Sequence, residues 1–160
     1  MAKSYICVFD CETIPDANLI RKIYGIDGSD EDVSVQAMAL QKEASGSDFL
    51  PVMFHRVVAI SAVMADEYGK FLKVSTMEGK DEREIIAKFL KFINDYNQRL
   101  VSFNGRGFDL PMLMVRAMRY NLNAAAYYES ENKELNKNKW ENYRARYSPK
   151  FHLDLLDFIS

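Results

Sequence analysis

The spacing of hydrophobic residues changes between residues 56 and 103, and this change constrains the fold more than any other feature. Residues 56–66 (RVVAISAVMAD) and 69–76 (GKFLKVST) are rich in β-branched and aromatic residues around a polar turn, which predicts a β-hairpin. Residues 81–97 then place their apolar side chains on one helical stripe, with acidic residues in the first turn. Residues 99–103 (RLVSF) again resemble a strand. This order predicts an α/β sheet with a crossover connection.

Other segments extend this expected sheet. Residues 5–11 are typical of a strand, and we expect them to complete an antiparallel three-strand meander with the hairpin. Residues 110–120 predict an apolar helix with Pro111 in its first turn. Residues 150–159 (KFHLDLLDFI) predict a final strand, and residues 16–50 an insertion with one or two helices.

Composition excludes several classes of protein. The 160 residues have an apolar fraction of 48%, which is typical of one globular domain, and we expect a single domain over residues 1–160. The formal charge of −2 provides no general attraction for a polyanion, so any contact with nucleic acid must be local. No apolar stretch reaches the length of a signal peptide or a membrane span. We therefore expect a cytoplasmic protein without a membrane partner.

Two carboxylates follow the first predicted strand segment, in the sequence FDCETIP. Residues i and i+2 of a strand face the same side, so Asp10 and Glu12 would project together, while Cys7 and Cys11 would be buried free thiols on the other side. Adjacent carboxylates repel unless a cation lies between them, and oxygen ligands favour Mg²⁺ or Mn²⁺ over zinc. The alternative is that the strand has already ended and both side chains lie in solvent.

A third carboxylate follows another predicted strand, in the sequence SFNGRGFDLP. Two glycines permit a tight turn, and Asp109 then arrives at the start of a helix. Asp109 can be a helix N-cap. A residue at a helix start is also held rigidly at the carboxyl end of the sheet, where the ligand sites of open α/β sheets are found.

Together, these two stretches resemble the DEDD superfamily of 3′–5′ exonucleases. Asp10-Cys-Glu12 is similar to the first motif of that superfamily, Asp-x-Glu, and residues 104–109 (NGRGFD) are similar to the second, Asn-x-x-x-(Phe/Tyr)-Asp. The residues around both motifs are most similar to those of predicted 3′–5′ exonucleases related to the proofreading domain of family B DNA polymerases. This resemblance implies a ribonuclease H-like mixed sheet, with an antiparallel meander and parallel strands, flanked by helices.

The resemblance also implies an activity and a set of ligands. The implied metal ligands and catalytic residues are Asp10, Glu12 and Asp109. They would hold two ions, Mg²⁺ or Mn²⁺, for the hydrolytic removal of nucleotides from single-stranded 3′ ends of DNA, with RNA as an alternative substrate. Glu12 would help to orient the attacking water. Asn104 and Phe108 would support the second motif or contact the terminal nucleotide, and Arg106 would approach a phosphate.

The third motif of the superfamily, which supplies a fourth carboxylate from a late helix, is not evident. The spacing of His152 and Asp157 matches the pattern His-x-x-x-x-Asp. The apolar and polar residues of their segment, however, alternate as they do in a strand. In relatives, as the resemblance implies, such a segment precedes the last helices. We therefore interpret Asp154 and Asp157 as structural residues or as residues that support the metal ligands, and we expect the C-terminal helices to be missing. The alternative function is a catalytically silent nucleic-acid-binding or interaction module, and the uncovered sheet face predicts homo-oligomers.

The segment 133–150 combines six basic residues, two acidic residues and interleaved aromatic rings. Basic charge and aromatic faces suit a single strand, because phosphates pair with the charge and bases stack on the rings, so Trp140 and Tyr143 are candidate contacts. A solvated surface segment is an equally good interpretation. Elsewhere, we interpret His55 as a turn residue and the acidic run at residues 27–32 as a solvated loop.

Overall fold

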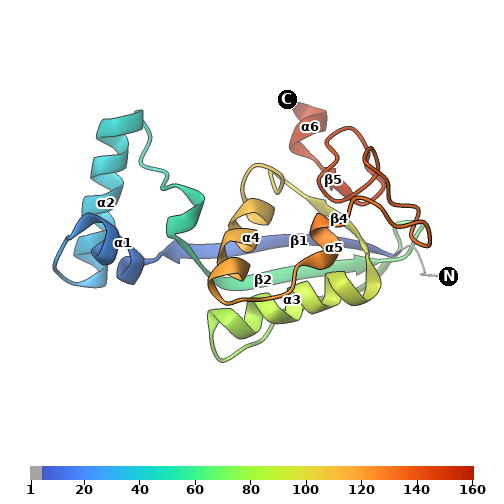
Figure 1. Ribbon diagram of the computed structural model, residues 1–160, viewed down its shortest axis with the longest axis horizontal. Coiled ribbons are helices and arrows are strands. Elements are labelled where there is room, and N and C mark those ends of the chain that lie inside the picture. The colour runs from blue at the N-terminus through green and yellow to red at the C-terminus, as the bar shows by residue number, and fades with distance from the viewer. Residues whose placement is uncertain (1–4) are drawn as a thin grey trace.

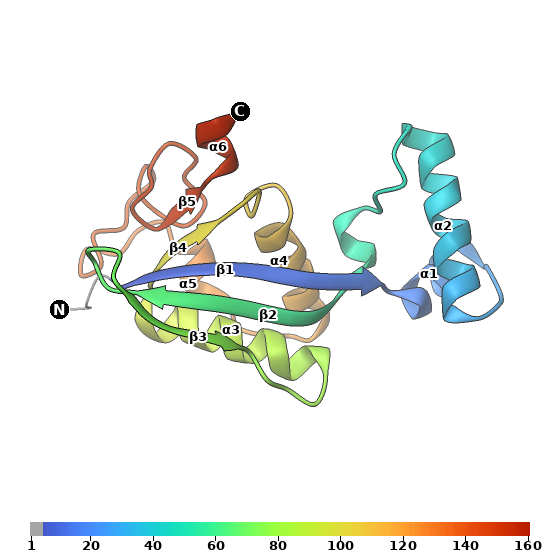
Figure 2. The same ribbon diagram turned by 180° about the vertical axis from the view of Figure 1, so that it is seen from behind.

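A computed structural model describes residues 5–160 and contains one mixed five-stranded sheet (Figures 1 and 2). The strands are β1 (Ile6–Pro15), β2 (His55–Ala65), β3 (Phe71–Thr76), β4 (Arg99–Ser102) and β5 (His152–Asp154). Their order is β3-β2-β1-β4-β5. The β1–β2 and β2–β3 pairs are antiparallel, whereas β1–β4 and β4–β5 are parallel. The expected meander and parallel strands are confirmed.

Two strands differ in length from their predictions. β1 continues to Pro15, and Asp10 and Glu12 pair within it with Ser61 and Ala59 of β2. The interpretation that the strand ends before these carboxylates is therefore wrong. β5 is shorter than predicted, because the carboxylate of Asp154 accepts a hydrogen bond from the Leu156 N–H and the chain turns into a short helix.

The helices cover one face of the sheet and form a separate insertion. They are α1 (Ala17–Tyr24), α2 (Asp30–Ser45), the 3-10 turn η1 (Val52–Phe54), α3 (Glu82–Tyr96), α4 (Asp109–Arg119), α5 (Ala125–Tyr128) and α6 (Leu156–Ile159). The two long predicted helices are confirmed as α3 and α4. The acidic run at residues 27–32 is not wholly a loop, because Ser29 and Asp32 form a capping box at the start of α2. No helix of the described chain is long and apolar enough to span a membrane.

The main core lies between the sheet and the helices α3 and α4. Cys7 and Cys11 are buried on this side of β1 with Phe9, whose ring lies 5.0 Å from the ring of Phe89 in α3. Both cysteines are free thiols, as expected. Each fully buried large side chain of the α3 stripe contributes about 1.5–3 kcal/mol through removal of apolar surface from water. A second, smaller core lies within the insertion, between α1, α2 and η1.

The opposite face of the sheet exposes a row of valines. Val8 of β1 pairs with Val63 of β2, which in turn pairs with Val74 of β3. All three side chains are exposed, and Val74 retains 65% of its accessible surface. Apolar side chains are therefore exposed on this face. The same face carries Asp10 and Glu12, since they follow Val8 at intervals of two residues.

A buried ionic network connects the insertion to the main core. The guanidinium of Arg116 in α4 donates two hydrogen bonds to the Glu82 carboxylate at the start of α3, and its Nη1 donates to Asp16 Oδ2 at 2.8 Å. Glu82 Oε1 also accepts a hydrogen bond from the Val57 N–H in β2 at 2.8 Å. Asp16 caps α1 by accepting a hydrogen bond from the Leu19 N–H. Burial alone would raise the pKa of Asp16, but the hydrogen bonds from Arg116 and Leu19 lower it.

We expect Arg116→Ala to lower the free energy of unfolding by about 3–5 kcal/mol, because Asp16 and Glu82 would remain buried without their cation. The measurement is urea denaturation followed by circular dichroism. Arg119→Ala is the matched control, because Arg119 also bonds Asp16 but its side chain is 38% exposed. Its loss should cost about 1 kcal/mol or less. Equal losses for the two variants would contradict a central role for Arg116.

Candidate functional site

Asp10 and Glu12 project from the middle of β1 on the exposed face of the sheet. Their register with β2 changes immediately after Glu12, which pairs with Ala59 while Thr13 pairs with Val57. One residue of β2, Val58, is therefore extra at this point and forms a β-bulge. Bulges locally increase strand twist and redirect side chains, and they are common near active sites. The two carboxylates thus lie where the strand pair is distorted.

Asp109 is the first residue of α4 and is buried, with 4% of its surface exposed. The N-cap position belongs to Phe108, so the N-cap interpretation of Asp109 is wrong. Burial raises the pKa of the Asp109 carboxyl, and the negative charge of Asp10 raises it further. Hydrogen bonding with the Cys11 thiol opposes this shift. The structure therefore brings Asp109 next to the carboxylate segment of β1.

The turn before α4 is held by Asp154. The carboxylate of Asp154 accepts hydrogen bonds from the backbone N–H of Asn104 at 2.7 Å and of Arg106 at 2.9 Å. Gly105 lies so close to β4 that a Cβ there would be 2.0 Å from Ser102 Oγ, so only glycine fits. The predicted tight turn is confirmed, and so is the structural interpretation of Asp154.

The other candidate contacts of the second motif have different environments. The side chain of Asn104 is exposed, and its backbone adopts a left-handed conformation with φ of 58°. The ring of Phe108 is half-buried and packs edge-on against His55, with ring centroids 4.8 Å apart. The Nε of Arg106 is 3.4 Å from Asp157. Of these three residues, Asn104 is the most accessible to a ligand.

His55 is a buried strand residue, and its interpretation as a turn residue is wrong. It is the first residue of β2, where its Nε2 donates to the Leu50 carbonyl at 2.9 Å and its Nδ1 accepts from the Thr13 hydroxyl at 3.0 Å. Burial lowers the pKa of this imidazole. His55 therefore acts as a neutral support for Phe108.

The structure divides the aromatic residues of the segment 133–150 into two groups. Tyr143 is 1% exposed, and its hydroxyl donates to the Gln98 carbonyl at 2.6 Å. It is therefore not a surface for base stacking, and its assignment as a nucleic-acid contact is corrected. Trp140 and Tyr147 are 72% and 94% exposed. Lys137 is also buried, because its Nζ bonds the carbonyl of Ala126 at 2.8 Å.

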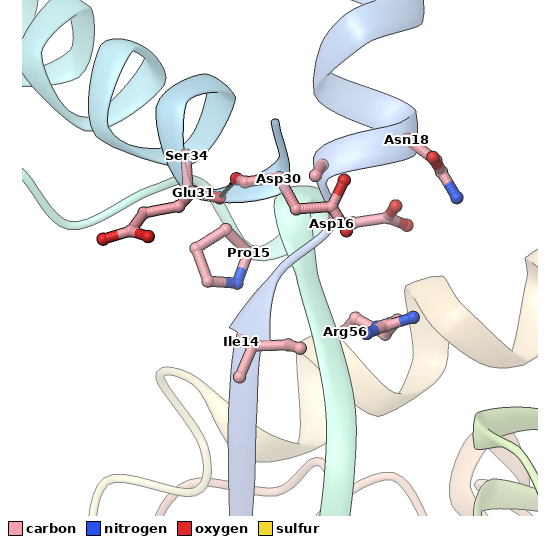
Figure 3. Close-up of a pocket in the computed structure, with 9 residues that line it drawn as sticks. Ile14, Pro15, Asp16, Asn18, Asp30, Glu31, Ser34 and Arg56 are labelled. Atoms are coloured by element: carbon pink, nitrogen blue, oxygen red, sulfur yellow. Dashed lines mark hydrogen bonds between the residues drawn. The ribbon is translucent and has the colours of Figure 1, made fainter. Parts of the chain in front are cut away.

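A cavity of about 180 Å³ lies where β1 meets the insertion (Figure 3). Its lining includes Asp30 of the acidic run, together with Asp16 and Arg56, two residues that the sequence alone did not indicate. Arg56 lies opposite Ile14, on the strand face that also carries Glu12. Within residues 5–160, its guanidinium has no hydrogen-bond or ion-pair partner. Strict alternation from the buried residues Ile60 and Ala62 would place Arg56 on the covered face, so the bulge at Val58 is what brings this arginine to the face of the carboxylates.

The donor set suits a divalent cation, although it does not form a closed cage. Among the described residues, no group of three or more His, Cys, Asp or Glu side chains is placed to hold a metal ion. The charge of Asp10 nevertheless raises the pKa of Asp109, so these two carboxylates repel each other. Glu12 faces the same side as Asp10. Carboxylate oxygens are the ligands that Mg²⁺ and Mn²⁺ prefer.

His152 and Asp157 are engaged elsewhere and do not complete this site. His152 is 1% exposed and lies in β5, where its Nε2 is 2.7 Å from Ser102 Oγ. Its Nδ1 has no partner in the described part of the chain. Asp157 forms ion pairs with Arg106 and Arg146, each at 3.4 Å. The interpretation of this segment as a strand, rather than a helical third motif, is confirmed for His152.

Protonation of His152 should destabilise the protein in acid. Burial, with a contribution from Arg106, lowers the pKa of His152 to about 4, whereas an unfolded chain has about 6.5. Stability due to the neutral imidazole is therefore complete above about pH 6.5 and is lost as the pH falls toward 4, by about 3 kcal/mol. Urea denaturation at several pH values measures this loss, which His152→Gln should reduce. An unchanged pH profile in the variant would contradict the assignment.

A comparison with known protein families agrees with the resemblance found in the sequence. Residues 47–160 match the family described as a predicted 3′–5′ exonuclease related to the exonuclease domain of PolB. The family B DNA polymerase of the hyperthermophilic archaeon Pyrobaculum calidifontis is 16% identical, with a TM-score of 0.49 over 97% of this chain. The chain spans only 16% of that polymerase. No curated protein matches the chain. Because the family match covers more than half of the sequence, the chain belongs to the predicted 3′–5′ exonucleases related to the exonuclease domain of PolB.

Proposed function

We propose that this chain is a Mg²⁺- or Mn²⁺-dependent 3′–5′ exonuclease domain acting on single-stranded 3′ ends of DNA, or of RNA. The observation that carries the proposal is the position of Asp109, which is buried at the start of α4 and hydrogen-bonded to Cys11, the residue between Asp10 and Glu12 in β1. Burial and the charge of Asp10 accordingly raise the pKa of the Asp109 carboxyl. Such like-charge strain is relieved when a cation binds. Family membership supports a nuclease, and the oxygen donors support a hard metal ion.

Each carboxylate has a distinct position in the proposed site. Two divalent ions, when bound, would supply Lewis-acid activation of water and neutralise charge on the phosphate. Asp109 is fixed by its burial at the start of α4, so it would set the position of a shared ligand. Asp10 and Glu12 are exposed and would face the substrate side. Arg56 pairs with Ile14, which follows Glu12 by two residues on the same face of β1. Its guanidinium would bind a phosphate of the nucleic acid next to the one being cleaved.

The first test is a calorimetric titration of Mn²⁺, followed by incubation with a 3′-tailed oligonucleotide labelled at its 5′ end. The wild type should bind metal and shorten the tail stepwise. Asp10→Ala should lower the rate on the order of 100-fold or more, since a transition-state ligand is lost. Without metal, its free energy of unfolding should be unchanged or about 1 kcal/mol higher, because repulsion with Asp109 is relieved.

Glu67→Ala is the matched control for this experiment, because Glu67 is an exposed carboxylate in the β2–β3 turn. It should leave metal binding and cleavage unchanged. Metal binding without shortening would favour the alternative function, a catalytically silent nucleic-acid-binding or interaction module. Failure of the wild type to bind Mn²⁺ would overturn the proposed metal site.

We further propose that Trp140 and Tyr147 provide the stacking surface for a single strand. Both rings are exposed in a basic segment, and Lys139 lies over the Trp140 ring with its Nζ 4.9 Å from the centroid. Basic charge beside an exposed ring is the chemistry that binds unpaired bases without reading their sequence. Self-association through the valine row stays a separate prediction.

Trp140→Ala and Tyr147→Ala should each weaken binding of an unpaired oligonucleotide about 10-fold, since stacking of one base is worth roughly 1–3 kcal/mol. Fluorescence anisotropy at fixed ionic strength, with EDTA present to prevent cleavage, measures the affinity. Tyr68→Ala is the control, because Tyr68 is 87% exposed but lies outside the segment. If all three variants bind the oligonucleotide as tightly as the wild type does, residues 133–150 are a solvated surface segment that does not bind nucleic acid.

A further inference from the structure

A second cavity, of about 830 Å³, lies at the end of the sheet where β1 and β4 begin. It is distant in the fold from Asp109, which follows the carboxyl end of β4. Its lining includes Met64, Leu72, Lys73, Phe92, Tyr96 and Gln98. The volume is in the range of small-molecule sites, which are mostly apolar with a few placed polar groups. Nothing in the proposed exonuclease activity uses this cavity.

The walls of the cavity offer aromatic and aliphatic surface. Phe92 and Tyr96 lie one helical turn apart on α3, and their ring centroids are 5.6 Å apart. Tyr96 is 57% exposed and Leu72 of β3 is 48% exposed. The side chain of Lys73 is on the helix-covered side of the sheet, because Lys73 pairs with Met64, and Met64 is buried against the core. A flat apolar ligand between β3 and α3 would cover these surfaces.

Most of the polar groups that line the cavity already have partners. Asp95 forms an ion pair with Lys91, and the Asn97 amide accepts from Lys137 at 2.6 Å. Lys73, by contrast, has no hydrogen-bond or ion-pair partner among residues 5–160. The cavity therefore presents one unpaired cation on its β3 side.

Gln98 is the second unsatisfied group. The residue is 6% exposed, and its Oε1 has no hydrogen-bond partner in the described chain. Its backbone carbonyl, by contrast, accepts from the Tyr143 hydroxyl. A buried acceptor without a donor is unfavourable, because the group has lost its bonds to water. Because Gln98 lines the cavity, a turn of its side chain would let this acceptor bind a ligand that carries an N–H or O–H group.

We propose that this cavity binds a planar aromatic anion that carries a hydrogen-bond donor, such as a nucleoside monophosphate. The donor would meet the Gln98 amide, the ring would pack against Phe92, Tyr96 and Leu72, and the anion would pair with Lys73. Charge complementarity, the unsatisfied amide and the aromatic walls together select this class. A purely apolar ligand would leave Gln98 unsatisfied, and a simple anion would leave the rings exposed.

The experiment uses the full chain carrying Asp10→Ala, in EDTA, so that it is independent of the metal site. Backbone and side-chain amide signals are followed by NMR during titration with adenosine 5′-monophosphate, indole-3-acetate or ribose 5-phosphate. The first two compounds each contain an aromatic ring and a hydrogen-bond donor, but the anion is a phosphate in the nucleotide and a carboxylate in indole-3-acetate. The third compound has a phosphate and no aromatic ring. We expect shifts at Gln98, Phe92 and Tyr96 with the ring compounds and weaker binding of the sugar phosphate by about 10-fold or more.

Three variants make the test specific. Gln98→Leu should weaken nucleotide binding about 10-fold while keeping or raising the melting temperature, since it removes an unsatisfied acceptor. Lys73→Met should weaken binding of both anionic ring compounds about 2- to 5-fold. Lys80→Met, an exposed lysine outside the cavity, should change nothing.

Several outcomes would overturn the proposal. Ribose 5-phosphate binding as tightly as the nucleotide would reveal only a site for anions. Shifts that depend on protein concentration without added ligand would show that a second copy fills the cavity. The absence of shifts at Gln98 at millimolar ligand would exclude the site, whatever the result of the exonuclease assay.

Discussion

The buried guanidinium of Arg116 is the interaction on which the arrangement of the helices depends. It connects α4 to the start of α3 through Glu82 and to the start of α1 through Asp16. Asp16 follows β1 directly, so the same contact fixes the end of the carboxylate strand. Three elements distant in the sequence therefore meet at one side chain. A buried charge of this kind is not in itself a source of great stability, but the loss of one partner leaves the other charges buried and uncompensated.

A second anchor acts at the other end of α4. Asp154 holds the backbone of Asn104 and Arg106, and the close approach of Gly105 to Ser102 leaves this turn no room to shift. The first helical residue after the turn is the buried carboxylate of the site. The position of this carboxylate is thus determined by contacts to β5 on one side and to α3 on the other. Neither contact depends on a bound ligand, so the position of the carboxylate is fixed by the protein alone.

Local patterns predicted the elements, whereas distant contacts decided the environments of single residues. The meander and α3 followed from strand and helix spacing, and the shared face of Asp10 and Glu12 followed from strand geometry. Tyr143 and Trp140 could not be distinguished, because a tyrosine is equally suited to a core with one polar partner and to a surface. The partner, a carbonyl 45 residues earlier, is not encoded in the local pattern. The Arg116 network was missed for the same reason.

The insertion has its own small core, and a salt-bridged junction attaches it to the sheet domain. Arg116 and Asp16 are 100 residues apart, so closing this contact orders a long loop and is expected late in folding. If the junction opens, both ions regain hydration, which offsets part of the loss. The helices α1 and α2 can then open as a unit while the sheet stays intact. Amide hydrogen exchange should accordingly report two free energies of opening, and the lower one should belong to the amides of the insertion.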